Sequence, residues 1–205
     1  MNLNTVLGKA RRRIGTALDY LNPNYMNARS TAKTSLGFMG TFIERWLPET
    51  LRKSELESIF NFLPLSDNLF TAGQPTENQL ATVKTAGFVQ VINLAPHGLE
   101  NSLPNEADIV TALGMTYTHI PVDFKNPTDA DFSAFCAAME QAGERKVLVH
   151  CAANMRVSAF MFRYRTQVLG HSVASAQTDL HRIWQPFDVW ADFILRPLPD
   201  TQSSR

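Results

Sequence analysis

The sequence has few of the features that mark several large classes of protein. Its two cysteines, Cys136 and Cys151, are too few for a disulfide-stapled fold, which favours a reducing compartment. No apolar run approaches the roughly 20 residues that span a bilayer, and no signal-peptide core follows the first methionine. The formal net charge is zero, so no overall field attracts nucleic acid. We therefore expect a cytoplasmic globular protein without a nucleic-acid partner.

Recognisable cofactor and metal patterns are also missing. The chain contains neither a Walker-type lysine motif nor a glycine-rich dinucleotide fingerprint. Four of its histidines lack the spacing of a metal site: His97, His119, His171 and His181. We predict that the protein needs no metal and no cofactor.

Charge is distributed unevenly along the chain. Residues 1–53 carry nine Lys or Arg and three Asp or Glu, whereas residues 54–205 carry ten and sixteen. Such asymmetry suggests a basic arm beside a mildly acidic domain. We therefore predict a basic N-terminal helical extension over residues 1–53 and one domain over residues 54–205.

The extension contains two candidate helices. Residues 5–21 place apolar side chains on one face and basic ones around it, and a second helix is expected from about Thr41 to Lys53. The first helix could dock on its own domain, be disordered, or lie on an anionic membrane surface. The motifs described below all follow Ser54, so we expect a chain starting there to keep its activity on small substrates.

Strand and helix patterns alternate from residue 66 onward. The expected elements are strand 69–72, a helix with a capping box at 76–79 that ends at Gly87, strand 88–94, helix 104–113, strand 115–122, helix 128–142, strand 146–150, and helices 155–168, 172–184 and 187–195. Such alternation predicts an α/β fold: a mostly parallel central sheet with helices on both faces.

One strand–loop–helix segment has the composition of a reactive site. The apolar strand ending at His150 is followed by the loop Cys151–Arg156 and then by a helix. The first turn of a helix presents unpaired N–H groups, and its dipole attracts anions. The same field favours an ionised, nucleophilic thiolate at Cys151. A buried, inert cysteine is the alternative, and Cys136 fits that description because its predicted helix face is apolar.

Other residues of this segment have expected roles. The planar guanidinium of Arg156 can hold two oxygens of an anion. The backbone N–H groups and Ser158 would contact the substrate, with Ser158 donating a hydrogen bond to the thiolate or the leaving group. His150 is expected to orient the loop. The predicted substrate-binding residues are His150, Ala152, Ala153, Asn154, Met155 and Ser158.

The loop and its setting resemble the cysteine-dependent protein phosphatases, whose signature is H-C-x5-R-[ST]. The resemblance covers about residues 56–195 and is greatest to small bacterial dual-specificity-phosphatase-like proteins, related to the beta-lactamase-hydrolase-like family. It rests on four segments: Ala72–Thr76, Val91–Leu94, Ile120–Asp123 and the cysteine loop. The resemblance implies a hydrolase of phosphate monoesters that acts through a cysteinyl phosphate. It also implies a general acid after the third segment, for which Asp123 is our candidate.

The loop departs from that signature by one residue. Four residues separate Cys151 from Arg156, and this spacing resembles the loop of rhodanese-like sulfurtransferases, with Asn154 where that loop has glycine. Asparagine tolerates a left-handed backbone, so the turn can still form. Two alternatives to the phosphatase therefore remain: sulfur transfer through a Cys151 persulfide, and a binding module for phosphorylated ligands that does not turn them over.

Overall fold

The computed structural model describes residues 29–44, 55–99 and 101–198. The helix expected at 5–21 therefore lies outside the described residues, as does most of the helix expected from Thr41 to Lys53. None of the described helices combines the length and apolarity needed to cross a membrane.

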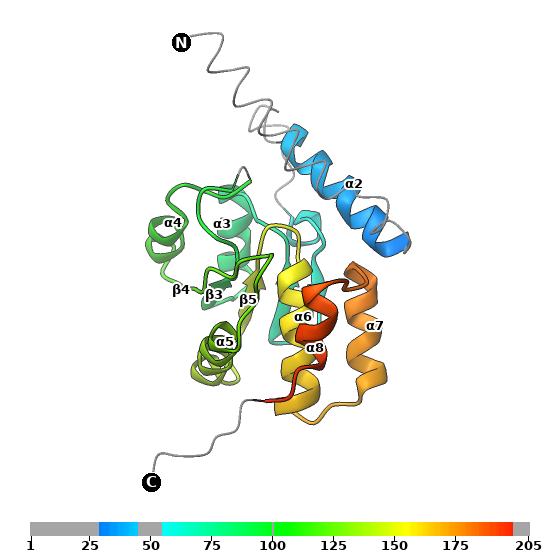
Figure 1. Cartoon of the computed structure of the whole chain (residues 1–205). Coiled ribbons are helices and arrows are strands. Elements are labelled where there is room, and N and C mark those ends of the chain that lie inside the picture. The colour runs from blue at the N-terminus through cyan, green and yellow to red at the C-terminus, as the bar shows by residue number, and fades with distance from the viewer. Residues whose placement is uncertain (1–28, 45–54, 100, 199–205) are drawn as a thin grey trace.

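A five-stranded sheet forms the centre of the domain (Figure 1), with the order β1-β2-β5-β3-β4. Four strands are parallel to one another, and the short β1 pairs antiparallel with β2 at one edge. The predicted mostly parallel α/β sheet is thus confirmed, although the sequence did not reveal β1. The strands are β1 (Leu63–Pro64), β2 (Leu69–Ala72), β3 (Gln90–Asn93), β4 (Thr116–His119) and β5 (Val147–His150).

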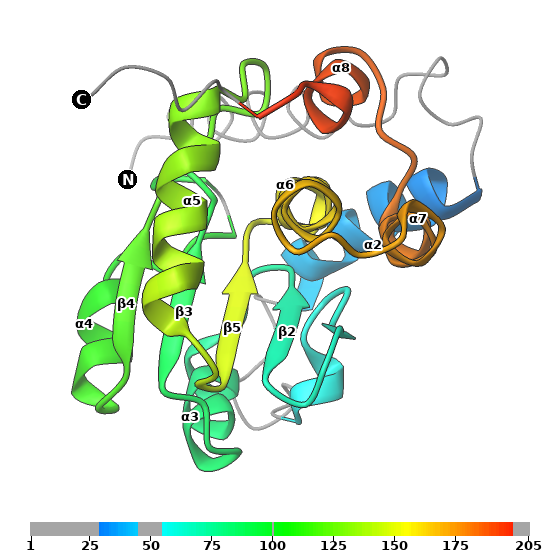
Figure 2. The same ribbon diagram turned by 90° about the horizontal axis from the view of Figure 1, so that it is seen from below.

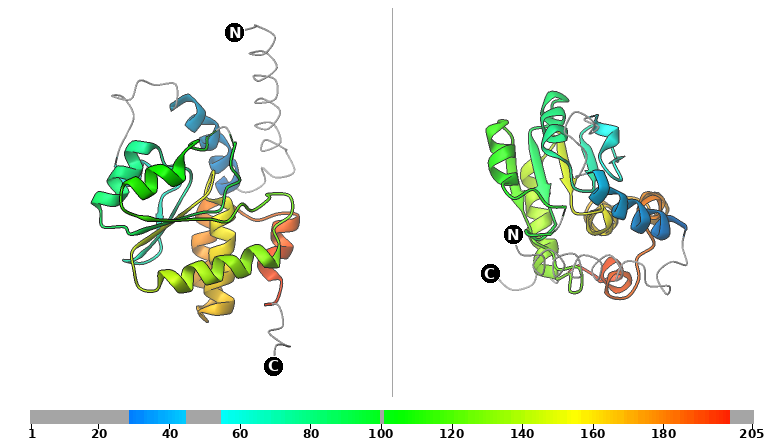
Figure 3. Two further views of the ribbon diagram at one scale, coloured as in Figure 1. Left: turned by 90° about the vertical axis from the view of Figure 1, so that its left-hand side faces the viewer. Right: turned by 90° about the horizontal axis from the view of Figure 1, so that it is seen from above.

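Helices cover both faces of the sheet, as the left-hand view of Figure 3 shows. Val91 and Leu148 belong to the core shared with α3 and α4, whereas Ile92 and Val149 point into the core under α5 and α6. Successive residues of a strand alternate between its faces, so an inner strand with both faces covered must be apolar throughout. The helices are α3 (Glu77–Thr85), α4 (Glu106–Ala112), α5 (Asp129–Ala142), α6 (Met155–Arg163), α7 (Val173–Ile183) and α8 (Val189–Leu195).

Helix ends follow the local chemistry of the sequence. The predicted capping box at Thr76 forms with Gln79, and a second one joins Thr128 to Asp131. The expected helix at 155–168 differs in its last part. The α-helical α6 ends at Arg163, and residues 164–168 form a π-helical turn.

An aromatic layer packs α8 onto the rest of the domain. Trp184 and Trp190 are both fully buried, and the centres of their rings lie 6.0 Å apart. Figure 2 shows α7 and α8 on the same side of the sheet as α5 and α6. This layer fixes the position of α8 relative to the carboxyl ends of the strands.

One helix of the N-terminal region is described, and it differs from the expectation. The sequence suggested a helix beginning near Thr41, whereas α2 runs from Arg29 to Glu44. It contacts α7 beside the end that leads to α8 (Figure 1).

Candidate anion-binding active site

The cysteine loop follows the strand that lies between β2 and β3. Ligands of open α/β sheets bind at the carboxyl ends of such strands. The N–H of Cys151 continues the ladder by donating to Ala72 O at 3.3 Å. Asn154 then takes a left-handed conformation with φ of 65°, as predicted, and α6 begins at the next residue. We call residues 151–156 the anion loop.

The surrounding chain engages the carbonyl groups of the anion loop. Ala152 O accepts hydrogen bonds from Asn101 Nδ2 at 2.9 Å and from the N–H of Gln74 at 3.2 Å. Ala153 O accepts one from Asn61 Nδ2 at 3.0 Å. Holding these carbonyls fixes the peptide planes of the loop.

Several N–H groups of the loop are left for a ligand. Within the described part of the chain, no hydrogen bond is donated by the N–H groups of Ala152, Ala153, Asn154, Met155 and Arg156. Buried N–H groups normally find a partner. Their concentration at a helix N-terminus is the arrangement that binds oxyanions in proteins.

Arg156 is held at the rim of the anion loop. Its Nε donates to Val122 O at 3.0 Å, and its guanidinium lies 5.1 Å from the ring of Phe124. Only 4% of the side chain is exposed. The terminal guanidinium nitrogens make no hydrogen bond to the described residues, so they can hold two oxygens of a bound anion.

Asp123 directly follows the residue whose carbonyl holds Arg156. Its side chain is exposed, and its carboxylate accepts a hydrogen bond from the N–H of Lys125 at 2.9 Å. The acid role of Asp123 stays a prediction. Two nearby carboxylates have structural partners: Asp129 pairs with Arg163, and Asp131 completes the capping box of α5.

The structure engages Ser158 differently from the expectation. Its hydroxyl donates to Met155 O at 3.0 Å and accepts a hydrogen bond from the indole N–H of Trp184 at 3.1 Å. Ser158 lies one turn into α6, where bonding back to the preceding turn is a common use of serine. The expected donation to the thiolate is therefore not what the structure shows.

The side chain of His150 lies in a buried polar network. Its Nε2 is 3.0 Å from Glu106 Oε1, and both side chains are almost completely inaccessible. The same carboxylate accepts from Gln74 Nε2 at 2.9 Å, from Asn93 Nδ2 at 2.8 Å and from the Tyr117 hydroxyl at 3.3 Å. His150 and Asn93 are the last residues of β5 and β3, Gln74 follows β2 by two residues, and Tyr117 is the second residue of β4. Glu106 thus connects side chains from β3, β4, β5 and the segment after β2.

The charges of this network decide its protonation. Burial alone would raise the pKa of Glu106, but the attraction of His150 and the hydrogen bonds from His150, Gln74 and Tyr117 outweigh it. The pKa of Glu106 consequently lies below its ordinary value, and the group is a carboxylate at neutral pH. The predicted orienting role of His150 is compatible with this placement.

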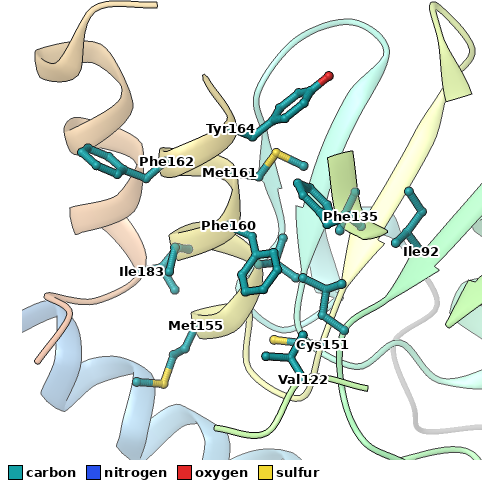
Figure 4. Close-up of a cluster of buried hydrophobic side chains, with 14 of the residues drawn as sticks. Ile92, Val122, Phe135, Cys151, Met155, Phe160, Met161, Phe162, Tyr164 and Ile183 are labelled. Atoms are coloured by element: carbon teal, nitrogen blue, oxygen red, sulfur yellow. The ribbon is translucent and has the colours of Figure 1, made fainter. Parts of the chain in front are cut away.

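The two cysteines lie in different surroundings. Cys151 is buried in the core beside Val122 (Figure 4), at the foot of the anion loop. Cys136 is half-buried on α5, where burial raises the pKa of its thiol. Of the two, Cys151 alone lies next to the free N–H groups and Arg156.

Sequence reasoning missed the residues that support the loop from outside. Glu106 lies in the first turn of α4, where acidic residues commonly complement the helix dipole, so its place in the sequence does not single it out. Asn61, Asn101 and Gln74 sit in connecting segments without a repeating pattern. One signal was available for Gln74, which lies within Ala72–Thr76, one of the four segments that carry the family resemblance.

Comparison with known proteins agrees with this geometry. The family model described as "Beta-lactamase hydrolase-like protein, phosphatase-like domain" matches residues 61–164. A beta-lactamase hydrolase-like protein from Xylella fastidiosa is 31% identical over 121 residues, which cover 53% of this chain and 28% of that protein. The chain therefore spans little more than a quarter of this relative.

Solved structures are similar as well. The crystal structure of a candidate phosphatase (DUF442) from Shewanella putrefaciens is 36% identical, with a TM-score of 0.61, and the match covers 68% of this chain and 92% of that one. The TpbA protein of P. aeruginosa, crystallised with phosphotyrosine, is 18% identical with a TM-score of 0.50, over 59% of this chain and 72% of that one. The second likeness concerns the fold alone.

Proposed function

This chain belongs to the phosphatase-like domain family of the beta-lactamase hydrolase-like proteins, and from that premise we propose that it hydrolyses phosphate monoesters through a cysteinyl phosphate. The observation that carries the proposal is the anion loop, in which Cys151 is followed by N–H groups without a described partner and by Arg156, whose Nε is held by Val122 O. Such donors stabilise the charge that develops on a transferring phosphoryl group.

The proposed reaction has two steps. The Cys151 thiolate attacks phosphorus, an S–P bond forms, and the bond to the leaving oxygen breaks while Asp123 donates a proton to that oxygen. Water then attacks the cysteinyl phosphate and gives its proton to the Asp123 carboxylate. The S–P bond breaks, inorganic phosphate leaves and the thiolate is regenerated.

The position of Asp123 supports its role as the acid. Val122 O fixes Arg156, so the backbone carrying Asp123 is anchored to the residue that holds the phosphoryl oxygens. The side chain is exposed and can reach a leaving group above the loop. Phosphorylated protein side chains are one substrate class to test, since the P. aeruginosa protein of the same fold was crystallised with phosphotyrosine.

A paired assay tests the proposal. Purified protein and its Cys151→Ser variant are compared on an aryl phosphate, and turnover should vanish in the variant. Asp123→Asn should slow hydrolysis about 10²-fold for a poor leaving group and much less for a good one, because acid catalysis matters most where the leaving oxygen is basic. Equal losses for both leaving groups would remove Asp123 from the acid role.

The shortened loop requires one further arm of this assay. Four residues between Cys151 and Arg156 also resemble the spacing of sulfurtransferases. Thiosulfate with cyanide is therefore offered to the same preparations. Sulfur transfer without phosphate turnover would replace the proposed function, and phosphate binding without either reaction would indicate a module that only binds its ligand.

A further inference from the structure

A short segment, Phe60–Asn61, is bound to the anion loop. Asn61 Nδ2 donates to Ala153 O at 3.0 Å, and Asn154 Nδ2 donates back to Asn61 O at 2.8 Å. Phe60 O accepts the N–H of Gly73 at 2.7 Å, and Gly73 is the bridge partner of Ala153. The orientation of the loop peptides therefore depends on where this segment lies.

Helix α2 holds the opposite side of the same segment. Thr34 Oγ1 accepts a hydrogen bond from Asn61 Nδ2 at 3.1 Å. Gly37 lies against the ring of Phe60, so closely that an added Cβ would be 2.7 Å from Phe60 Cε2. One hydrogen of the Asn61 side-chain amide thus bonds to α2, and the other bonds to the anion loop.

The docking face of α2 is unusually polar. The residues buried there follow the spacing of one helix face: Thr31, Thr34, Ser35 and Phe38. Thr31 Oγ1 accepts the N–H of Gln185 at 2.9 Å, and Thr34 Oγ1 donates to Ile183 O at the end of α7. Hydroxyl groups paired one by one fix the register of a helix more strictly than an apolar stripe does. The first residue of α6, Met155, also points its side chain toward α2 (Figure 4).

The backbone of Asn61 needs such support. Its φ of 51° lies in the left-handed region, which is uncommon for residues other than glycine. Conformations of this kind persist where the surroundings over-determine them, and they concentrate at functional sites. Here the surroundings are α2 on one side and the anion loop on the other.

We propose that α2 completes the anion site, with Thr34 and Asn61 as positioning residues that orient the Ala153 peptide and the N–H groups beside it. The inference rests on the proposed function of the anion loop. It extends the site beyond the matched family domain, because α2 precedes residue 61. A helix that contacts no substrate would then control how well the loop binds an anion.

The experiment uses the full-length chain and two readouts: protection of Cys151 from iodoacetamide by inorganic phosphate, and aryl phosphate kinetics. Thr34→Val removes the acceptor for Asn61 and the hydrogen bond to Ile183 O, with little change of shape. Asn61→Gly keeps the left-handed backbone without strain and removes only the amide bridge. Thr31→Val is the matched control, because it removes one hydrogen bond of α2 that does not lead to the loop.

We expect Thr34→Val and Asn61→Gly each to weaken phosphate protection about tenfold and to lower kcat/KM by a similar factor, the equivalent of ~1.4 kcal/mol. Thermal unfolding should change little for Asn61→Gly, and Thr31→Val should bind phosphate nearly as the unmodified chain does. The inference is overturned if Asn61→Gly binds phosphate normally, or if Thr34→Val and Thr31→Val behave alike. If Thr34→Val does not fold, phosphate protection in Asn61→Gly tests the inference on its own. An unmodified chain that neither binds nor hydrolyses phosphate would overturn the proposed function and this inference with it.

Discussion

The anion loop is supported from two regions whose chemistry differs. On α4, the Glu106 carboxylate is buried and charged, and it contacts polar side chains of β3, β4, β5 and the segment after β2. Beside the loop, α2 acts through neutral hydroxyl and amide groups, and its hydrogen bond to Asn61 leads to the loop carbonyl of Ala153. A buried charge is costly to leave unpaired, whereas a neutral hydrogen bond contributes about 1 kcal/mol net. The first region should therefore decide whether the domain folds, and the second how well the loop works.

Removing the buried carboxylate is the strongest test of this difference. Glu106→Ala should lower the free energy of unfolding by about 3–5 kcal/mol, because it leaves the buried His150 and three other donors without their acceptor. Urea unfolding measures the change. Asp179→Asn, which breaks the ion pair with Arg165 away from the loop, is the matched control. A loss no larger than in that control would contradict the central role assigned to Glu106.

Gly73 lies where the two regions meet, so its substitution should affect both. A Cβ at Gly73 would lie 3.0 Å from Phe60 O and 3.1 Å from Ala152 O. Gly73→Ala should therefore cost about 1–3 kcal/mol of stability, as overpacking usually does, and should also weaken phosphate binding. Gly40→Ala is a suitable control, because nothing lies within 4 Å of its added Cβ. If Gly73→Ala is destabilised but binds phosphate normally, stability and phosphate binding are independent at this position, which contradicts the prediction.

Removing α2 altogether should affect activity more than folding. From the sequence we expected a chain starting near Ser54 to keep its activity on small substrates. The contacts of Thr34 and Gly37 now favour a different outcome: such a chain retains its sheet but loses about tenfold in kcat/KM on an aryl phosphate. Far-UV circular dichroism and steady-state kinetics on the same preparation measure both quantities. Full activity would restore the original expectation.

Lowering the pH should reduce the stabilisation that Glu106 gives to the folded protein. The pKa of this carboxyl is depressed in the folded protein, so its stabilisation is fully present above the ordinary value of about 4.5 and is lost as the pH falls through the folded pKa. The difference in unfolding free energy between the unmodified chain and Glu106→Gln should thus be constant near neutrality and shrink below pH 4.5. A difference that grows on acidification would show that another group dominates.

Local chemistry made much of the fold predictable. The β-branched residues of β3 and β5, the capping residue Thr76 and the glycine after α4 each act through their immediate neighbours, and the elements they define are present as expected. The left-handed turn at Asn154 was also predictable, since few residues tolerate that conformation.

The supports of the site could not be predicted in this way. Helix α2 is rich in Ser, Thr and Gly, which are weak helix formers, and its buried face lacks the apolar spacing that marks a docked helix. Glu106 and His150 are 44 positions apart in the numbering, and their pairing depends on α4 packing beside a completed sheet. Strand β1 is two residues long and contains Pro64, which is tolerated only at an edge. Each of these features depends on long-range contacts.

The position of β5 in the sheet also bears on how the protein is made. β2 and β3 follow one another along the chain, yet β5 lies between them, so they cannot pair directly. During synthesis neither strand can complete its pairing until β5 has been made, because β5 pairs with both of them. Sheets closed by such late insertion fold slowly because distant segments must meet first. Cys151 is the next residue in the chain, so the contacts around the anion loop form only as the last inner strand is inserted.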